Sequence, residues 1–308
     1  MKYLKLIRYQ NLLLLALMQL VFRFGFLEKQ NVYLSLADWQ FLLLVLATVC
    51  IAAGGYIINN IFDYKTDLEN KPDEVIVGKS ISESLAYNLY AGFTFVGVGI
   101  GFYLSNVILK PGFAAIFIVI AATLYLYATS LKQSLLIGNI IIAILLSFSV
   151  IIIGIFDLFP ATYDGNQQIM RLIFDIIIDY AIFTFMINFI REIIKDLEDI
   201  NGDKNQGMNT LPIILGVEKT SKIVLGLSFI PLFCLAYYIN FYIFASGLIL
   251  STLYALFFLL APLLYFVIKL WSAKKQSDFR HLSIVLKLIL LFGILSIALI
   301  SYNMHHHA

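Results

Sequence analysis

The chain contains about nine apolar stretches that are each long enough to cross a lipid bilayer, and this feature decides the fold class. A transmembrane helix needs roughly 20 mostly apolar residues, whereas a barrel strand needs about half as many. Because lipid offers no hydrogen-bond partners, a segment of this length satisfies its backbone as a helix. The sequence therefore predicts an all-α polytopic membrane bundle of about nine transmembrane helices, near residues 9–27, 39–61, 84–108, 112–130, 134–157, 170–195, 220–244, 246–270 and 283–302.

The amino-acid composition excludes a soluble protein. Hydrophobic residues make up 61% of the 308 residues and charged residues only 13%, which is about half the charged share of a typical soluble chain. So little polar material could not cover the surface of a soluble domain. The formal net charge of +2 gives no basis for a nucleic-acid partner. No linker is long enough to separate a second domain, so residues 1–308 are predicted to form a single transmembrane domain.

Positive charge is distributed unevenly between the two sides of the predicted bundle. With nine spans, one side carries all but four of the 21 Lys and Arg residues. Short cytoplasmic loops of membrane proteins are enriched in Lys and Arg. The sequence therefore predicts an integral protein of the cell membrane, with its N-terminus on the cytoplasmic side and its C-terminus outside. The four cationic residues on the external side are Arg23, Lys29, Lys110 and Arg171.

Two cytoplasmic loops carry polar side chains with the same spacing. On a helix, residues at i, i+3 and i+7 share one face. Carboxylates on one face repel one another unless a cation lies between them, and ligands that are all oxygens suit a hard ion such as Mg²⁺. The residues with this spacing are Asn60, Asp63 and Asp67 after the second stretch, and Asp196, Asp199 and Asp203 after the sixth.

A magnesium ion with few protein ligands usually takes its remaining ligands from water and substrate phosphates. Two facing acidic clusters at a membrane surface therefore suggest a diphosphate bridged by metal ions, with the active site on the cytoplasmic side. The alternative is that these are solvated charges at helix ends. Asn201-Gly202 is a strong turn signal, which would place Asp203 just beyond the end of its helix.

These motifs resemble those of the UbiA superfamily of intramembrane prenyltransferases. Asn59, Asn60, Asp63 and Asp67 match its first motif, except that Asn60 stands where an Asp is usual. The resemblance implies a UbiA-type fold, a prenyl diphosphate substrate held through Mg²⁺, and substrate contacts from Asn59 and Asn60. It implies five metal ligands: Asp63, Asp67, Asp196, Asp199 and Asp203.

The loop after the fourth stretch adds two candidate catalytic residues, Tyr127 and Lys132. Family members carry a Tyr and a Lys here. Lys132 would neutralise diphosphate oxygens as a point charge, and Tyr127 would stabilise the cationic allyl carbon or position the diphosphate. The alternative is that both residues simply anchor a helix at the membrane surface.

Four further residues are candidates for substrate binding. Arg8 and Asn11 resemble the Arg-Pro-x-Asn opening of the family branch that prenylates glycerol phosphates, without its Pro. Arg8 would bind an acceptor phosphate or else anchor the first helix. Asn188 and Arg191 lie further into the membrane than the second acidic motif, and either line the same cavity or form helix-to-helix hydrogen bonds.

The acceptor is predicted from the pairs Leu131-Lys132, Gly138-Asn139 and Lys195-Asp196, which look most like the glycerol-phosphate branch. This resemblance implies transfer of a geranylgeranyl group to a hydroxyl of geranylgeranylglycerol phosphate in membrane lipid synthesis. The first alternative is an aromatic acceptor of the 4-hydroxybenzoate, dihydroxynaphthoate or homogentisate type in quinone biosynthesis. The second is a membrane transporter, which would place polar groups near the middle of its spans.

Overall fold

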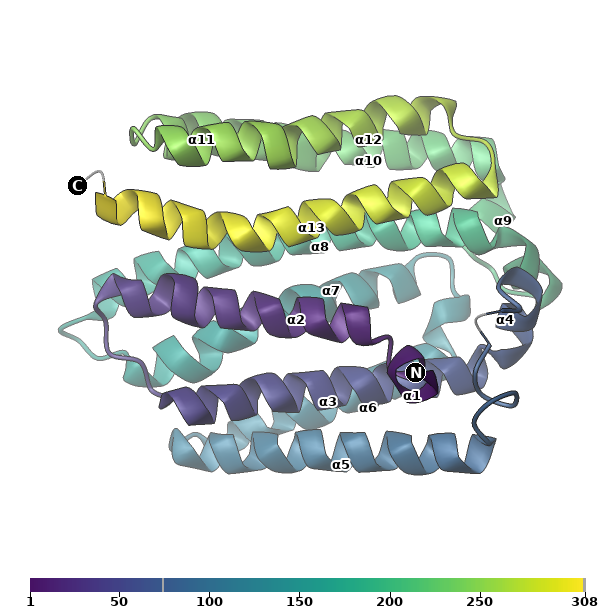
Figure 1. Ribbon diagram of the computed structural model, residues 1–308, viewed down its shortest axis with the longest axis horizontal. Helices are drawn as coiled ribbons and strands as arrows, with labels where there is room; N and C mark the ends of the chain where they lie inside the picture. The colour runs from purple at the N-terminus through teal and green to yellow at the C-terminus, as the bar shows by residue number, and fades with distance from the viewer. Residues whose placement is uncertain (74, 307–308) are drawn as a thin grey trace.

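The computed structural model describes residues 1–73 and 75–306, and helices account for nearly all of this part of the chain. Within it, nine helices are long and apolar enough to cross a membrane, which confirms the predicted fold class. The α-helices in Figure 1 are α1 (Lys2–Leu6), α2 (Tyr9–Leu20), α3 (Asp38–Phe62), α4 (Tyr64–Asn70), α5 (Glu83–Val107), α6 (Ala114–Thr129), α7 (Ile137–Ile153), α8 (Gln167–Asn205), α9 (Leu211–Leu215), α10 (Val217–Tyr238), α11 (Ile249–Ala255), α12 (Ala261–Ser272) and α13 (Gln276–His306).

Four of the spans contain a π-helical segment, where the backbone hydrogen bonds reach one residue further than in an α-helix. These segments extend α2, α7 and α10, and one joins α11 to α12. In each case the helix continues through the segment, so the span crosses the bundle as helical backbone. They are Val21–Phe26, Gly154–Leu158, Ile239–Phe244 and Leu256–Leu260.

The spans run side by side along the long axis of the molecule (Figure 1). The longest helix, α8, packs against α7, α10 and α13, while α3 packs along α5 and α6. The short helices α1, α4 and α9 all lie toward the right-hand end of the molecule in Figure 1, and α4 and α9 both contact α8. The N-terminal half of the bundle therefore presents α3 and α4 at the same end as the last turns of α8.

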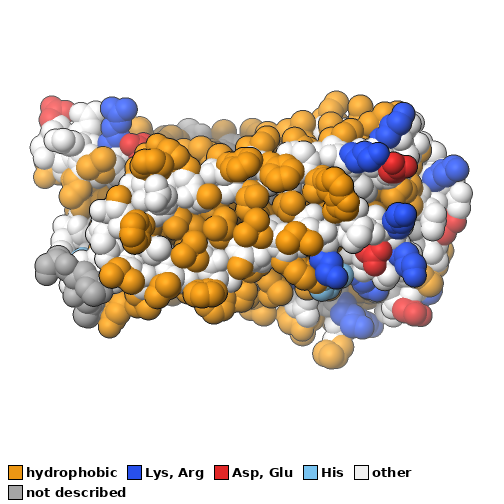
Figure 2. Space-filling model, turned by 90° about the horizontal axis from the view of Figure 1, so that it is seen from above, with side chains coloured by type: hydrophobic (Ala, Val, Ile, Leu, Met, Phe, Trp, Pro, Cys, Tyr) orange, Lys and Arg blue, Asp and Glu red, His pale blue; other side chains and the backbone are white. Residues whose placement is uncertain are grey.

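Charged side chains gather at the two ends of the bundle, and a broad hydrophobic band separates them (Figure 2). More of the charges lie at the end that carries α4 and α9 (Figure 2). A hydrophobic band of this kind is what lipid requires of a spanning protein. The chain is an integral membrane protein.

The opposite end is fixed by a buried arginine. Arg23 is only 4% exposed, and its guanidinium lies 2.8 Å from Asp157, 2.7 Å from Glu28 and 3.2 Å from Asp38. Arg23 Nη2 also donates a hydrogen bond to the Leu36 carbonyl. Charges removed from water are tolerated only with such partners, so this network joins the end of the first span to the fifth span and to the loop before α3.

Two local expectations were wrong. The first acidic motif does not lie on one continuous helix, because α3 ends at Phe62 and α4 begins at Tyr64 with Asp63 at the junction. Asn201-Gly202 does not end the second acidic helix, because α8 continues to Asn205. At Gly202 a contact between α4 and α8, described below, takes the place of the expected turn.

Candidate active site

The first acidic motif meets the loop after the fourth span at Asp63. The Lys132 ammonium forms an ion pair with the Asp63 carboxylate, and the Asn59 amide donates a hydrogen bond to the same group. The side chains of Lys132 and Asp63 are only 9% and 15% exposed, so solvent screens this pair weakly. Two residues that the sequence placed in different loops therefore contact each other directly.

The second acidic motif has its own lysine. Lys71 Nζ lies 2.8 Å from an Asp199 carboxylate oxygen and 3.8 Å from Glu198. Asp196 is held differently, because Asn139 Nδ2 donates a 2.8 Å hydrogen bond to it from α7. Gly138, next to Asn139, lets α7 approach the Lys132 loop, since a Cβ there would lie 2.9 Å from the Lys132 backbone.

Asn70 joins the two motifs and was missed by the sequence reasoning. Its amide nitrogen donates a 2.9 Å hydrogen bond to the Asp199 carbonyl, and its amide oxygen accepts a 2.8 Å bond from the Gly202 N–H. A Cβ at Gly202 would lie 2.6 Å from the Asn70 side chain. The signal in the sequence is that Asn70 extends the first motif's spacing by another three residues beyond Asp67.

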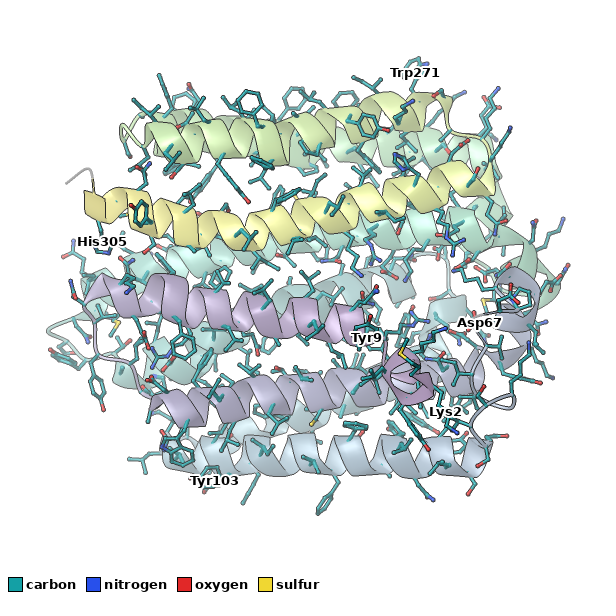
Figure 3. All side chains as sticks on the ribbon, in the orientation of Figure 1. Lys2, Tyr9, Asp67, Tyr103, Trp271 and His305 are labelled. Carbon is teal, nitrogen blue, oxygen red and sulfur yellow. The ribbon has the colours of Figure 1, made fainter. Side chains whose placement is uncertain are left out.

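The acids at this end of the bundle influence one another electrostatically. Burial, and next the charge of Asp63, raise the pKa of Asp67 to about 6, and Asp199 adds to the effect. The negative charges of Asp199 and Asp63 also act on the Asp203 carboxylate. Figure 3 places Asp67 at the same end as Lys2, away from Tyr103 and His305. The two acidic motifs therefore lie close together at this end of the bundle.

Cations offset these acids. Burial alone would lower the pKa of Lys71, but the charge of Asp199 outweighs it and raises that pKa. Burial likewise would lower the pKa of the Arg8 guanidinium, and the fields of Tyr56 and Asp63 raise it. Among residues 1–73 and 75–306, no three His, Cys, Asp or Glu side chains are gathered closely enough to hold a metal ion by themselves.

A cavity of about 190 Å³ opens behind the acidic end and brings together five of the predicted residues. A second cavity of about 110 Å³ adjoins it and contains Asn188. Tyr56 lines both cavities, and Lys195 and Glu192 line the first. The predicted residues that line the larger cavity are Arg8, Asn11, Asn59, Tyr127 and Arg191.

Two of the predicted substrate-binding residues have backbone partners. Asn60 Nδ2 donates hydrogen bonds to the carbonyls of Tyr56, at 2.7 Å, and Leu6, at 3.2 Å, so Asn60 tethers α1 to α3. Asn188 Nδ2 donates to the Thr184 carbonyl of its own helix at 2.9 Å. Asn60 therefore has a structural role that its place in the acidic motif did not indicate.

Comparison with known proteins decides the family. Residues 20–300 match the UbiA prenyltransferase family. The chain belongs to the UbiA prenyltransferase family. The resemblance found in the motifs is thereby confirmed, and the enzyme class with it.

This UbiA prenyltransferase is 33% identical, over 213 residues, to the digeranylgeranylglyceryl phosphate synthase of Sulfurisphaera tokodaii, with 65% of this chain and 71% of the relative aligned. A solved structure concerned with a digeranylgeranylglyceryl phosphate synthase in membranes has a TM-score of 0.61 at 22% identity, covering 96% and 98% of the two chains. A UbiA homologue from Archaeoglobus fulgidus, solved with GPP and Mg²⁺ bound, has a TM-score of 0.59 at 17% identity, covering 96% and 99%.

Proposed function

We propose that this UbiA prenyltransferase transfers a geranylgeranyl group from geranylgeranyl diphosphate to a hydroxyl of geranylgeranylglyceryl phosphate, using Mg²⁺. The observation that carries the proposal is that two acidic motifs, each paired with a lysine, lie together at one end of the bundle, and that Asn59 of the first motif also lines the larger cavity. The identity to digeranylgeranylglyceryl phosphate synthases supports the choice of acceptor.

The acidic end fits magnesium. Its donor set consists of carboxylate and amide oxygens, which Mg²⁺ prefers. In the described part of the chain, the buried Asn59 Oδ1 has no hydrogen-bond partner, which is what an atom awaiting a ligand would show. Burial, and next the charge of Asp63, raise the pKa of Asp67 to about 6, and a cation bound beside this carboxylate would oppose both effects. We assign the metal to Asp63, Asp67, Asp199 and Asp203, with Asp196 held behind them by Asn139.

Bound Mg²⁺ would neutralise the diphosphate and so make it a better leaving group. Lys132 and Lys71 would also neutralise part of the negative charge of the diphosphate. Lys132 pairs with Asp63, and Lys71 pairs with Asp199. With Mg²⁺ on these carboxylates, each lysine would turn to a diphosphate oxygen. Such a group placed where negative charge develops on the leaving group favours the transition state.

The cavity behind this end protects the reactive carbon. Departure of diphosphate leaves an allylic cation, and an apolar enclosure keeps water from it. Ile51, Phe117 and Leu124 line the cavity and give the prenyl chain an apolar surface. Tyr127, which also lines this cavity, would stabilise the cation through its ring face.

An acceptor panel tests this function. Purified full-length protein in detergent receives labelled geranylgeranyl diphosphate with geranylgeranylglyceryl phosphate, 4-hydroxybenzoate or dihydroxynaphthoate, with and without EDTA. We expect a prenylated product only from the glycerol phosphate, and none after EDTA unless Mg²⁺ is restored. A product from an aromatic acid would instead identify a quinone-type enzyme, and turnover that persists in EDTA would exclude the metal assignment.

We also propose that residues 1–308 act as one domain, with the acidic end in the cytoplasm and the C-terminus outside. The support is the excess of Lys and Arg at that end. In a chain lacking Cys50 and Cys234, we expect a membrane-impermeant maleimide to label Asp164→Cys in sealed right-side-out vesicles. Lys204→Cys should react only after permeabilisation, and the reverse pattern would invert the assigned orientation.

A further inference from the structure

Lys287 lies inside the bundle, although its charge counted toward the cytoplasmic side in the sequence. Helix α13 begins at Gln276, so at 1.5 Å per residue Lys287 is about 16 Å along it. The side chain is half-buried and lines the cavity of about 110 Å³, together with Arg191 and Asn11. A lysine three turns into a membrane helix is costly unless something compensates its charge.

No carboxylate compensates Lys287 among the described residues. Its ammonium donates a 2.7 Å hydrogen bond to the neutral Asn11 side chain. Of the described residues that line the two adjoining cavities, Glu192 is the one carboxylate, and it is already engaged. Lys195 lies 2.8 Å from Glu192, and Arg191 lies 3.6 Å from it.

The balance of charge here is therefore positive. Arg191 and Lys287 are close enough to repel each other, yet both line the same cavity. Arg191 Nε has only a long 3.4 Å contact to the Ser283 carbonyl. Arg191 and Lys287 therefore line one largely apolar cavity, and the nearby carboxylate, Glu192, is already neutralised by Lys195. Two cations in this situation form a site for an anion.

We propose that Lys287 and Arg191 bind the phosphate of the acceptor and so make a phosphorylated acceptor the preferred one. This inference rests on the proposed function and adds a residue, Lys287, that no motif indicated. The donor diphosphate has its own cations, Lys71 and Lys132, at the acidic end. Phosphate at the inner site would therefore come from the second substrate.

The spacing of the two sites fits this division. Arg191 precedes Asp199 by two turns of α8, which is about 12 Å of helix. That separation keeps two phosphate groups apart and leaves room between them for a glycerol unit and the reacting allylic carbon. Asn11, which accepts the Lys287 hydrogen bond, lines both cavities and so connects the inner site to the place of reaction.

The test uses Lys287→Gln, which can still donate a hydrogen bond to Asn11 but carries no charge, and Lys287→Arg, which keeps the charge. Full-length proteins in detergent are compared for equilibrium binding of radiolabelled geranylgeranylglyceryl phosphate and of the unphosphorylated alcohol. The matched control is Lys222→Gln, on the surface of α10, where Lys222 pairs with Glu218. KM for each substrate and kcat are measured in parallel.

We expect Lys287→Gln to weaken binding of the phosphorylated acceptor by about 10- to 100-fold and to raise its KM similarly, because a hydrogen bond between charged groups is lost. Binding of the alcohol and the KM for geranylgeranyl diphosphate should change less than about twofold. Lys287→Arg should restore most of the affinity, and Lys222→Gln should match the wild type. A purely structural lysine would instead give equal losses for both acceptors.

Each outcome separates this inference from the proposed function. Unchanged phosphate affinity in Lys287→Gln, with wild-type turnover intact, overturns the anion site and leaves the function standing. Charge-dependent binding in a protein that does not turn this acceptor over supports the site and overturns the function. A wild type that binds the alcohol as well as the phosphate overturns the site. If Lys287→Gln does not fold, Lys287→Met replaces it in the same binding assays. The wild-type affinities for the phosphorylated acceptor and for the alcohol are then compared in the same way.

Discussion

Asp63→Ala and Asp199→Ala are each expected to reduce pyrophosphate release from geranylgeranyl diphosphate by at least about 10²- to 10³-fold, the cost of removing one preorganised electrostatic group from an active site. Each substitution removes a proposed metal ligand, and it also frees the lysine that the carboxylate now holds. Initial rates at saturating Mg²⁺ and substrate measure the loss.

Asp63→Asn and Asp199→Asn keep the size of the side chain and separate loss of charge from loss of packing. Asp164→Asn, at the opposite end of the bundle, is the matched control and should retain wild-type rates. Elution as a single species and an unchanged thermal transition in detergent would show that the variants still fold. Wild-type turnover by both Asp63→Ala and Asp199→Ala would remove the metal site from the mechanism.

Lys132→Met is expected to lower kcat by about 10²-fold and to raise the KM for geranylgeranyl diphosphate, since the variant lacks a cation at the leaving group. Lys132→Arg should recover part of kcat, because it keeps the charge while changing the geometry of the contact. The KM for the acceptor should change little. Steady-state kinetics with each substrate varied in turn would separate these effects.

The alternative for Lys132 is a membrane anchor, and it makes a different prediction. An anchoring lysine would be exposed, and its loss would reduce insertion without altering kcat per folded molecule. The 9% exposure of the Lys132 side chain and its contact with Asp63 argue against that role. Lys219→Met, at an exposed cationic position of the same end, provides the comparison. Equal kcat in Lys132→Met and Lys219→Met would show that Lys132 is a membrane anchor and has no catalytic role.

The spans could be predicted from the sequence because lipid imposes a simple requirement of length and apolarity. The helices begin and end within a few residues of the predicted ones, except that α8 continues to Asn205 and α13 begins at Gln276, seven residues before the predicted start. The approach of the two acidic motifs was also predictable, since both follow spans that end on the same side. These properties depend on local sequence and on topology alone.

The contacts within the site could not be predicted in the same way, because they depend on how the helices rotate and tilt. Packing between distant segments decides which acid each lysine pairs with. It also decides that Asn60 bonds to Leu6 and that Lys287 lies inside the bundle. The turn signal at Asn201-Gly202 failed for the same reason. The Gly202 N–H donates a hydrogen bond to the Asn70 side chain, and the missing Cβ lets that side chain pack against α8, so a tertiary contact occupies the position that the turn signal marked.

Both hydrogen bonds of Asn70 end on main-chain atoms of α8, and this sets the width of the gap between the two halves of the site without any help from charge. A gap of constant width discriminates between ions by radius. Mg²⁺ requires an octahedron of oxygens at about 2.0–2.1 Å, whereas Ca²⁺ coordinates oxygens at longer and more variable distances. At the proposed metal site, a spacing fixed in this way by one amide side chain would favour Mg²⁺ over the larger Ca²⁺.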